Sequence, residues 1–209
     1  MKSSNRILTD VDREELEPVI AEMQRLCPDV MARKIPDANV QQAFVLNEVQ
    51  KEYKNGKFFT LSVGCFEDTA YEYLKAKETG VVGIDPEKNF DLHTYIGKTN
   101  KLYDIVFATS VLEHVEDDEQ FLDDMCSLMK VGGLGILTMD FKNDYKAGDP
   151  VPYTDVRFYT RHDLEVRLKA VLDKNDCEFV DEPDWTGKDR FVYQGHNYSF
   201  ATFVFRKTK

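Results

Sequence analysis

Leu61-Ser-Val-Gly-Cys-Phe-Glu-Asp-Thr69, followed by Val81-Val-Gly-Ile-Asp85, is the stretch that decides the fold of this chain. An apolar run ends at Gly64, a segment typical of a helix start follows, and a second apolar run ends at Asp85, about twenty residues after the glycine. This order is typical of a βαβ unit, in which the glycine turn and an acid for the ribose hydroxyls form a pocket for an adenosine ligand. The sequence therefore predicts an α/β fold with an adenosine-binding site.

The bulk composition is typical of one globular domain that does not bind nucleic acid. The chain has 209 residues, of which 42% are hydrophobic and 12% aromatic, enough for one sizeable core. Its net charge of −11 repels phosphate backbones and tolerates or favours a cationic small molecule. No apolar run is long enough to span a bilayer, no signal peptide is visible, and the four cysteines form no CxxC pair. We therefore expect a cytoplasmic protein with reduced thiols, no membrane span and no nucleic-acid partner.

The pattern of predicted elements changes at residue 57. We expect residues 1–56 to form an N-terminal helical segment and residues 57–209 to form the main domain. Apolar residues in the first region recur at helical spacing; they are Leu16, Val19, Ile20, Met23 and Leu26. Pro18 either opens this helix or kinks it. A second, less amphipathic helix is predicted over 38–54 and ends at Asn55-Gly56. The segment is expected to pack on the domain or to cap its pocket.

From residue 57 onward, predicted strands and helices alternate. The predicted strands cover 58–63, 81–84, 103–108, 134–139, 177–180 and 198–206, with a further short strand near Thr94-Tyr-Ile96. The predicted helices cover 69–77, 116–129 and 160–173. Gly132-Gly133 is expected to end the second helix, and Thr160 with Asp163 forms a capping-box-like start for the third. The alternation predicts a mostly parallel sheet, and the last two strands, which have no helix between them, predict an antiparallel edge.

The residues after Gly64 indicate the class of cofactor. A dinucleotide site needs G-x-G-x-x-G, but Phe66 stands at the second glycine position, where a pyrophosphate would need bare backbone. The amides around Glu67 to Thr69 are expected to receive a carboxylate or a phosphate. Taken alone, Gly64 is also compatible with an ordinary turn, and Asp85 with an acid that ends a surface strand. Together they favour an adenosine cofactor without a diphosphate over NAD or FAD.

Four motifs in order resemble the class I S-adenosylmethionine-dependent methyltransferases. They are Leu61-Ser-Val-Gly-Cys65, Val82-Gly-Ile-Asp-Pro86, Tyr103-Asp-Ile-Val-Phe-Ala-Thr-Ser-Val-Leu-Glu-His-Val115 and Leu128-Met-Lys-Val-Gly-Gly-Leu-Gly-Ile-Leu-Thr138. The resemblance implies a Rossmann-like, seven-stranded, mostly parallel sheet with helices on both faces. Its strand order would be 3-2-1-4-5-7-6, with strand seven antiparallel. It also implies S-adenosyl-L-methionine as the cofactor.

Transferred to this chain, the resemblance implies a cofactor site at the ends of several strands. Gly64 would pass under the methionine part, Asp85 would bind the ribose hydroxyls, and Pro86 would flank the adenine. Further cofactor contacts are expected from Ser62, Val63, Cys65, Thr69, Ser110 and Val111, of which the last two would line the sulfonium side. The adenine contacts after the third strand stay open, with Thr94 or its neighbours as guesses. Cys65-Phe66-Glu67 departs from the glycine-rich turn of the family.

Three residues after the predicted strands are candidates for acid–base chemistry. His114 is the candidate base, and the alternative is a structural histidine that bonds a loop carbonyl. Glu113 is expected to orient His114 or to bind the cofactor amine, and Asp140 is the second candidate acid. Some similar methyltransferases bind a metal through Glu-x-x-Glu-His. Because Ser110 stands at the first of these positions, no metal is predicted here.

The segment 150–159 is predicted to form a loop over the carboxyl edge of the sheet, where acceptors bind in such folds. Tyr153, Arg157 and Tyr159 are the candidate acceptor contacts; alternatively, Arg157 pairs with a surface acid and the tyrosines only pack. We expect a monomer or homodimer that transfers a methyl group to oxygen or nitrogen of a small-molecule or glycan-type acceptor. With its Arg157-Phe-Tyr-Thr160 segment and its late Tyr198-Ser-Phe-Ala-Thr202 strand, the chain resembles bacterial enzymes of surface-sugar modification, which implies the glycan-type acceptor. The alternatives are a non-catalytic binding or scaffold protein of this fold and a nicotinamide oxidoreductase.

Overall fold

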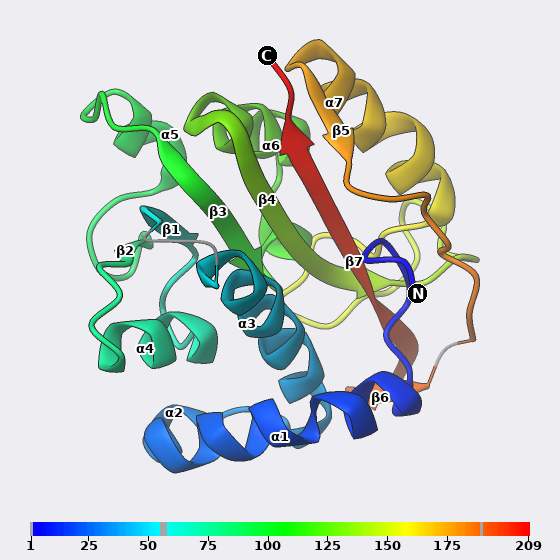
Figure 1. Ribbon diagram of the computed structural model, residues 1–209. Helices are drawn as coiled ribbons and strands as arrows, with labels where there is room; N and C mark the ends of the chain where they lie inside the picture. Colours follow the sequence, from blue (N-terminus) through cyan, green and yellow to red (C-terminus); the bar gives the residue numbers. More distant parts are fainter. Residues whose placement is uncertain (1, 55–57, 189) are drawn as a thin grey trace.

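A central sheet of seven strands organises the molecule (Figure 1). The computed structural model describes residues 2–54, 58–188 and 190–209. The strands are β1 (Thr60–Val63), β2 (Val82–Ile84), β3 (Tyr103–Thr109), β4 (Met129–Phe141), β5 (Cys177–Phe179), β6 (Phe191–Tyr193) and β7 (His196–Lys207). Their order is β2-β1-β3-β4-β7-β5, and β6 pairs with β7. β1 to β4 are parallel neighbours, whereas β7 runs antiparallel to β4, β5 and β6. The predicted mixed α/β fold with an antiparallel last strand is confirmed.

One edge of the sheet differs from the expectation. The short strand predicted near Thr94-Tyr-Ile96 is wrong, because these residues lie in helix α5 (Leu92–Ile96). Asp91 caps this helix: its two carboxylate oxygens accept hydrogen bonds from the amide and the hydroxyl of Thr94, at 2.8 and 2.6 Å. The expected order therefore appears without its outermost strand, and β6 supplies the seventh strand elsewhere.

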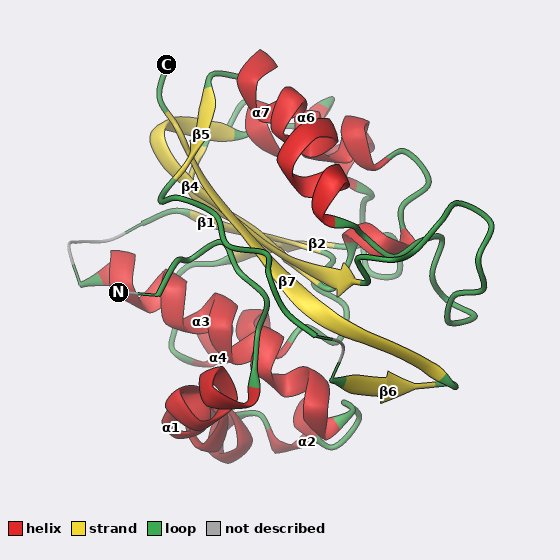
Figure 2. Ribbon diagram, turned by 90° about the vertical axis from the view of Figure 1, so that its right-hand side faces the viewer, coloured by secondary structure: helices red, strands yellow, loops and turns green. Residues whose placement is uncertain are grey.

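Helices cover both faces of the sheet (Figure 2). On one face lie α1 (Asp10–Leu26), α2 (Pro28–Met31), the short η1 (Pro36–Ala38), α3 (Asn39–Tyr53) and α4 (Thr69–Ala76). On the other lie α6 (Asp118–Ser127), the π-helical segment η3 (Asp163–Leu168) and α7 (Lys169–Lys174); a 3-10 turn, η2 (Leu112–His114), follows β3. Alternate strand residues feed the two cores: Val106 packs on the α6 side, and its neighbours Ile105 and Phe107 pack on the α3 side.

Helix α3 is buried on nearly all sides, which explains its weak amphipathic pattern. Ten of its fifteen residues are buried, including Gln41 and Gln42 among Val40, Phe44 and other apolar residues. The helix packs across β3 and β4. Its polar beginning therefore lies inside the molecule, and the site described below makes use of it.

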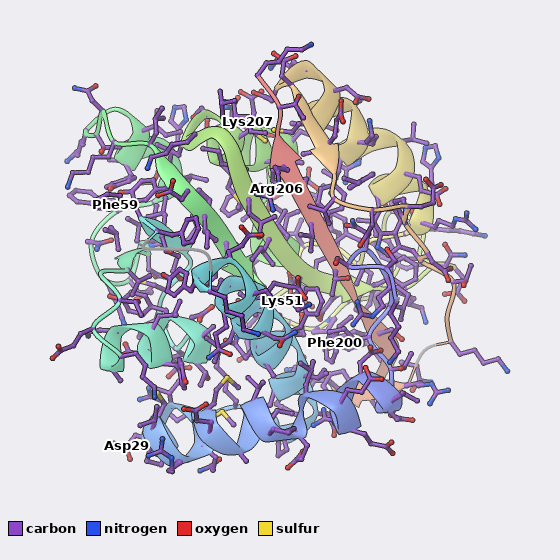
Figure 3. All side chains as sticks on the ribbon, viewed as in Figure 1. Asp29, Lys51, Phe59, Phe200, Arg206 and Lys207 are labelled. Carbon is purple, nitrogen blue, oxygen red and sulfur yellow. The ribbon has the colours of Figure 1, made fainter. Side chains whose placement is uncertain are left out.

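The N-terminal region contacts strand β7 of the sheet. Ile7 forms an antiparallel bridge with Ala201 of β7. Arg206 of β7, which is labelled in Figure 3, bonds Glu52 of α3 at 2.8 Å. Pro18 lies inside α1 and does not open it. The expected helix stop at Asn55-Gly56, and the boundary at 56/57, lie outside the described residues.

Two further predictions concern helix ends. The expected stop at Gly132-Gly133 is wrong: α6 ends at Ser127, and both glycines lie within β4, where its register with β3 shifts between Tyr103 and Ile105. The predicted capping pair is confirmed. Thr160 donates from its amide and hydroxyl to Asp163 Oδ2 at 2.9 and 2.7 Å, and the Asp163 amide donates to Thr160 Oγ1 at 3.2 Å.

Candidate active site

Gly64 forms the turn from β1 towards α4 with a backbone that only glycine tolerates easily. Its φ is +78°, in the left-handed region. A Cβ at this position would lie 2.4 Å from Cγ2 of Val111, the residue two positions after β3. The turn therefore needs glycine for two reasons, its dihedral angle and its close contact with Val111.

Asp85 directly follows β2 and is held in a fixed orientation. It is 8% exposed, and its Oδ2 accepts from the Phe66 amide at 3.0 Å while its Oδ1 accepts from the Glu87 amide at 2.8 Å. A carboxylate has about four acceptor positions, so roughly two remain for a ligand. The acid is thus held in place by the glycine turn and its own loop, and it keeps capacity to bind hydroxyls.

Gly64 and Asp85 line one cavity of about 430 Å³, within the usual size of small-molecule sites. Of the predicted cofactor residues, Val63, Gly64, Asp85, Pro86 and Val111 line it, whereas Ser62, Cys65, Thr69 and Ser110 do not. The other walls come mainly from α5 and α6; they include Phe90, Asp91, Leu92, His93, Gln120, Phe121 and Asp124. Thr94 does not line the cavity, and its hydroxyl is bound by Asp91.

The start of α4 does not offer the free amides that the sequence suggested. The amides of Thr69 and Ala70 both donate to Oε1 of Gln42, at 3.0 and 3.2 Å, and Asp68 caps the Tyr71 amide at 2.7 Å. Because a glutamine from α3 already fills this position, the prediction that the Thr69 amide receives a carboxylate or phosphate is wrong in this structure. The sequence feature that could have indicated this role of Gln42 is the pair of glutamines at the start of a helix that has no clear polar face.

Beside the cavity, the ends of β3 and β4 bring two carboxyl groups together in the interior. Glu113 is 0% exposed and Asp140 is 5% exposed. Ser110 adopts a left-handed φ of 55° and donates its hydroxyl to Glu113 Oε1 at 2.6 Å. Burial raises the pKa of Glu113. Burial, and then the neighbouring carboxyls of Glu113 and Asp155, raise the pKa of Asp140 well above its ordinary range, although the approaching Tyr198 hydroxyl favours the charged form.

Comparison with known proteins identifies the family. The family model described as "Methyltransferase domain" matches residues 31–171. The chain belongs to the class I S-adenosylmethionine-dependent methyltransferases. The ubiquinone biosynthesis O-methyltransferase of Rickettsia canadensis (strain McKiel) is 25% identical over 118 residues, which are 47% of this chain and 50% of that protein. The chain therefore spans about half the length of this curated relative.

Two solved structures support the fold of this methyltransferase. The [4+2]-cyclase SpnF aligns with a TM-score of 0.56 and 14% identity, over 81% of this chain and 82% of the other. A SAM-dependent methyltransferase from Archaeoglobus fulgidus aligns with a TM-score of 0.53 and 16% identity, over 79% and 94%. At these identities the likeness concerns the fold. S-adenosylmethionine is the cofactor of the family to which the chain belongs.

His114 of this methyltransferase anchors a loop. Its Nδ1 lies 3.0 Å from the Thr154 carbonyl and 3.1 Å from Asp155 Oδ1. Burial alone would lower the pKa of His114, but the hydrogen bond to Asp155 and the charges of Glu113 and Asp155 outweigh it and raise the pKa to about 9. The imidazole is then already protonated near neutral pH, which favours the structural alternative over a general base.

The expected acceptor residues are only partly available to a ligand. Tyr159 is 0% exposed and donates its hydroxyl to the Leu112 carbonyl and to Asp118 Oδ2, at 3.1 and 2.8 Å, so its role in stacking on an acceptor is contradicted by its burial. Arg157 pairs with Asp118 at 3.3 Å and donates to the Glu116 carbonyl at 2.6 Å. An acid holds it, as in the alternative, but this acid is buried and does not lie at the surface. Tyr153 is 83% exposed and lies at the surface.

Neither a metal cluster nor a membrane-spanning helix accompanies the site. Within the described part of the chain, no three or more His, Cys, Asp and Glu side chains are arranged to hold a metal ion. Over the same residues, no helix combines the length and the apolar composition needed to cross a membrane. Sequence reasoning did not place Asp155 and Tyr198 at the acid cluster, because they reach it from segments distant along the chain.

Proposed function

We propose that this methyltransferase moves a methyl group from S-adenosyl-L-methionine to oxygen or nitrogen of a small-molecule or glycan-type acceptor. One observation carries the proposal: Gly64 and Asp85 line a single cavity, and Val111, which also lines it, follows Ser110 at the edge of the buried acid cluster. A nucleoside in the cavity would thus have its reactive end beside Glu113 and Asp140.

The residues present fit the cofactor. The free acceptor positions of Asp85 suit the ribose hydroxyls, and the apolar walls from Ile84, Leu92 and Phe121 suit the adenine ring. The bound cofactor would supply an electrophilic methyl group on a positively charged sulfur. The side chains then have to position the acceptor, which can contribute roughly 7–11 kcal/mol at best, and take up its proton, which contributes about 10²–10⁴-fold in rate.

We assign the proton-accepting role to Asp140 and Glu113 and not to His114. Both carboxyls are buried and have raised pKa values, so they are better bases than an exposed carboxylate when ionised. We further propose that the protein acts in the cytoplasm as a monomer or homodimer. In support, its four cysteines are free thiols.

Calorimetric titration of S-adenosylmethionine into the wild type and the Asp85→Ala variant tests the cofactor site. Each charge-assisted hydrogen bond contributes about 1.5–3 kcal/mol, so we expect roughly ten- to hundredfold weaker binding in the variant. Glu87→Ala removes an exposed acid two residues away and should bind as the wild type does. Equal affinity of wild type and Asp85→Ala would remove Asp85 from the site.

Two further outcomes separate the alternatives. Release of S-adenosylhomocysteine with some acceptor supports transfer, whereas cofactor binding without transfer to any of a broad acceptor panel supports a binding protein of the same fold. Binding of NAD or NADP in place of S-adenosylmethionine would indicate an oxidoreductase. The likeness in fold to a [4+2]-cyclase makes the direct assay of methyl transfer necessary.

A further inference from the structure

Several buried oxygen atoms have no hydrogen-bond partner among the described residues, and four of them belong to one cluster near the carboxyl ends of β3 and β4. They are Gln41 Oε1, Glu113 Oε2, Asp140 Oδ1 and Asp155 Oδ2. Their side chains are almost completely enclosed: Gln41 is 1% exposed, and the Asp155 side chain is 4% exposed. When the carboxyls are ionised, all four atoms are acceptors. Since buried polar groups are normally satisfied, this group lacks a partner rich in hydrogen-bond donors.

The orientation of Gln41 follows from the bonds around it. Ser110 gives its single hydroxyl proton to Glu113 Oε1, and it can therefore only accept from Gln41 Nε2, which lies 3.5 Å away. The Gln41 amide nitrogen thus faces Ser110, and its oxygen is the end left unpartnered. Because Gln41 carries no charge and comes from α3, it points to the same missing donor independently of the three acids.

The charges at this place are also unbalanced. The side-chain charges that act most strongly on Asp140 are the carboxylates of Glu113 and Asp155, which have the same sign as its own. The cation that acts on Glu113 is His114, which is already paired with Asp155 at 3.1 Å. Burying a carboxylate without a counter-charge of its own is costly, and a bound cation would offset this cost.

We propose that the acceptor is an aliphatic amine that binds as its ammonium ion, with Asp140 and Glu113 as its counter-charges and Gln41 and Asp155 as further hydrogen-bond acceptors. This inference rests on the proposed function and narrows its acceptor to a nitrogen nucleophile. Without an acceptor, the two neighbouring carboxyls can hold one proton between them. A bound ammonium ion would donate hydrogen bonds to both carboxylates in place of that shared proton.

The chemistry balances with the groups present. The ammonium gives one proton to the Asp140–Glu113 pair, and the nitrogen lone pair that is freed attacks the methyl carbon. The carbon–sulfur bond breaks with its electron pair going to sulfur, which leaves neutral S-adenosylhomocysteine and a methylated ammonium. The raised pKa of Asp140 brings its proton affinity closer to that of an amine, which eases the first step.

Access to the four oxygens depends on the segment that carries Asp155. The Val156 amide donates to the Glu113 carbonyl at 2.8 Å, and His114 bonds the Thr154 carbonyl, so this segment lies against η2. The Tyr153 amide is fixed to Gln194 at 3.0 Å from the other side. We expect an acceptor to reach the four oxygens when this segment moves away from η2, with Asp155 returning over it.

The test compares amines with alcohols of the same skeleton. Phenethylamine, cyclohexylamine and 3-phenylpropylamine are titrated, each beside its matched alcohol, into protein saturated with S-adenosylhomocysteine. We expect the best amine to bind at least tenfold more tightly than its alcohol, and Asp140→Asn to reduce that preference at least tenfold. Asp144→Asn, which neutralises an acid whose side chain is 80% exposed, is the matched control and should leave the preference unchanged.

The outcomes decide between this inference and the proposed function. If no amine binds better than its alcohol, or if Asp140→Asn keeps the full preference, the amine inference is overturned while cofactor binding can still hold. If the protein does not bind S-adenosylhomocysteine at all, the proposed function itself fails first. A Gln41→Leu variant gives a second measurement, because it removes a neutral acceptor and should weaken the amine more than the alcohol.

Discussion

At the scale of single residues, the glycine turn shows how one missing Cβ makes room for a site. Gly64 combines a left-handed backbone with a close contact to Val111, and both features are visible only in the folded chain. The sequence pattern identified the position but not the second reason. Val111 therefore acts as a wall that is shared between the turn and the cavity.

Replacing Gly64 by alanine separates these two effects when Gly80→Ala serves as the control. Gly80 has the same φ of +78°, but a Cβ added there would meet no atom within 4 Å, so its substitution carries only the backbone strain of about 1–2 kcal/mol. Gly64→Ala should lose more stability in urea unfolding, and its cofactor affinity should fall. Adding Val111→Ala should restore part of the loss; no recovery in the double variant would contradict the contact.

His114 gives a prediction about pH. Its pKa is raised to about 9 from the ordinary 6.5, so its contacts with Asp155 and the Thr154 carbonyl stabilise the fold fully below about pH 6.5. That contribution is lost as the pH rises through 9. In urea unfolding between pH 6 and 10, His114→Gln should therefore flatten the pH dependence of stability, and a profile identical to that of the wild type would exclude the raised pKa.

At the scale of elements, α3 is the helix that links the two halves of the site. Gln41 reaches Ser110 after β3, and Gln42 caps the first amides of α4. One helix start thus fixes both the turn after Gly64 and the edge of the acid cluster.

Loss of the Gln42 cap should weaken the whole domain. Gln42→Ala leaves the amides of Thr69 and Ala70 buried without an acceptor, which costs about 1–3 kcal/mol for each group left unsatisfied. Gln24→Ala, at an exposed position of α1, should stay within about 0.5 kcal/mol of the wild type. Denaturant unfolding measures both, and equal effects would show that the cap carries no stability.

Most elements could be predicted because their local patterns agree with their burial. The exceptions have local causes. Residues near Thr94 have strand-like side chains, but the Asp91 cap starts a helix there. Gly132-Gly133 resembles a helix stop, yet the pair serves an irregular stretch of β4 that is set by pairing with β3. The side-chain cap in the first case, and the pairing of β4 with β3 in the second, override the propensity of the segment.

At the scale of the whole molecule, the site depends on contacts between segments far apart in the chain. The buried acids come from η2, β4 and the loop before η3, and Tyr198 approaches them from β7. No local sequence pattern links Asp155 to Asp140, so the sequence alone does not show that these two acids lie close together in the fold. That Gly64 and Asp85 line one cavity could be predicted from the sequence, because both residues belong to one βαβ unit.

The N-terminal segment gives the last prediction, because it ties the beginning of the chain to β7. Asn5 is 0% exposed; its Nδ2 donates to the Val204 carbonyl at 3.0 Å, and its Oδ1 accepts from the Val204 amide at 2.6 Å. Asn5→Ala breaks both bonds. It leaves the buried Val204 amide without an acceptor, at a cost of about 1–3 kcal/mol, whereas the Val204 carbonyl still accepts from the Val180 amide at 3.2 Å. Since β7 also carries Tyr198, the loosened strand should raise the KM for the acceptor more than the Kd of the cofactor. Ser4→Ala keeps its backbone bond to Asp181 and should behave as the wild type. Unfolding and binding measurements that do not distinguish the two variants would show that β7 is held without Asn5.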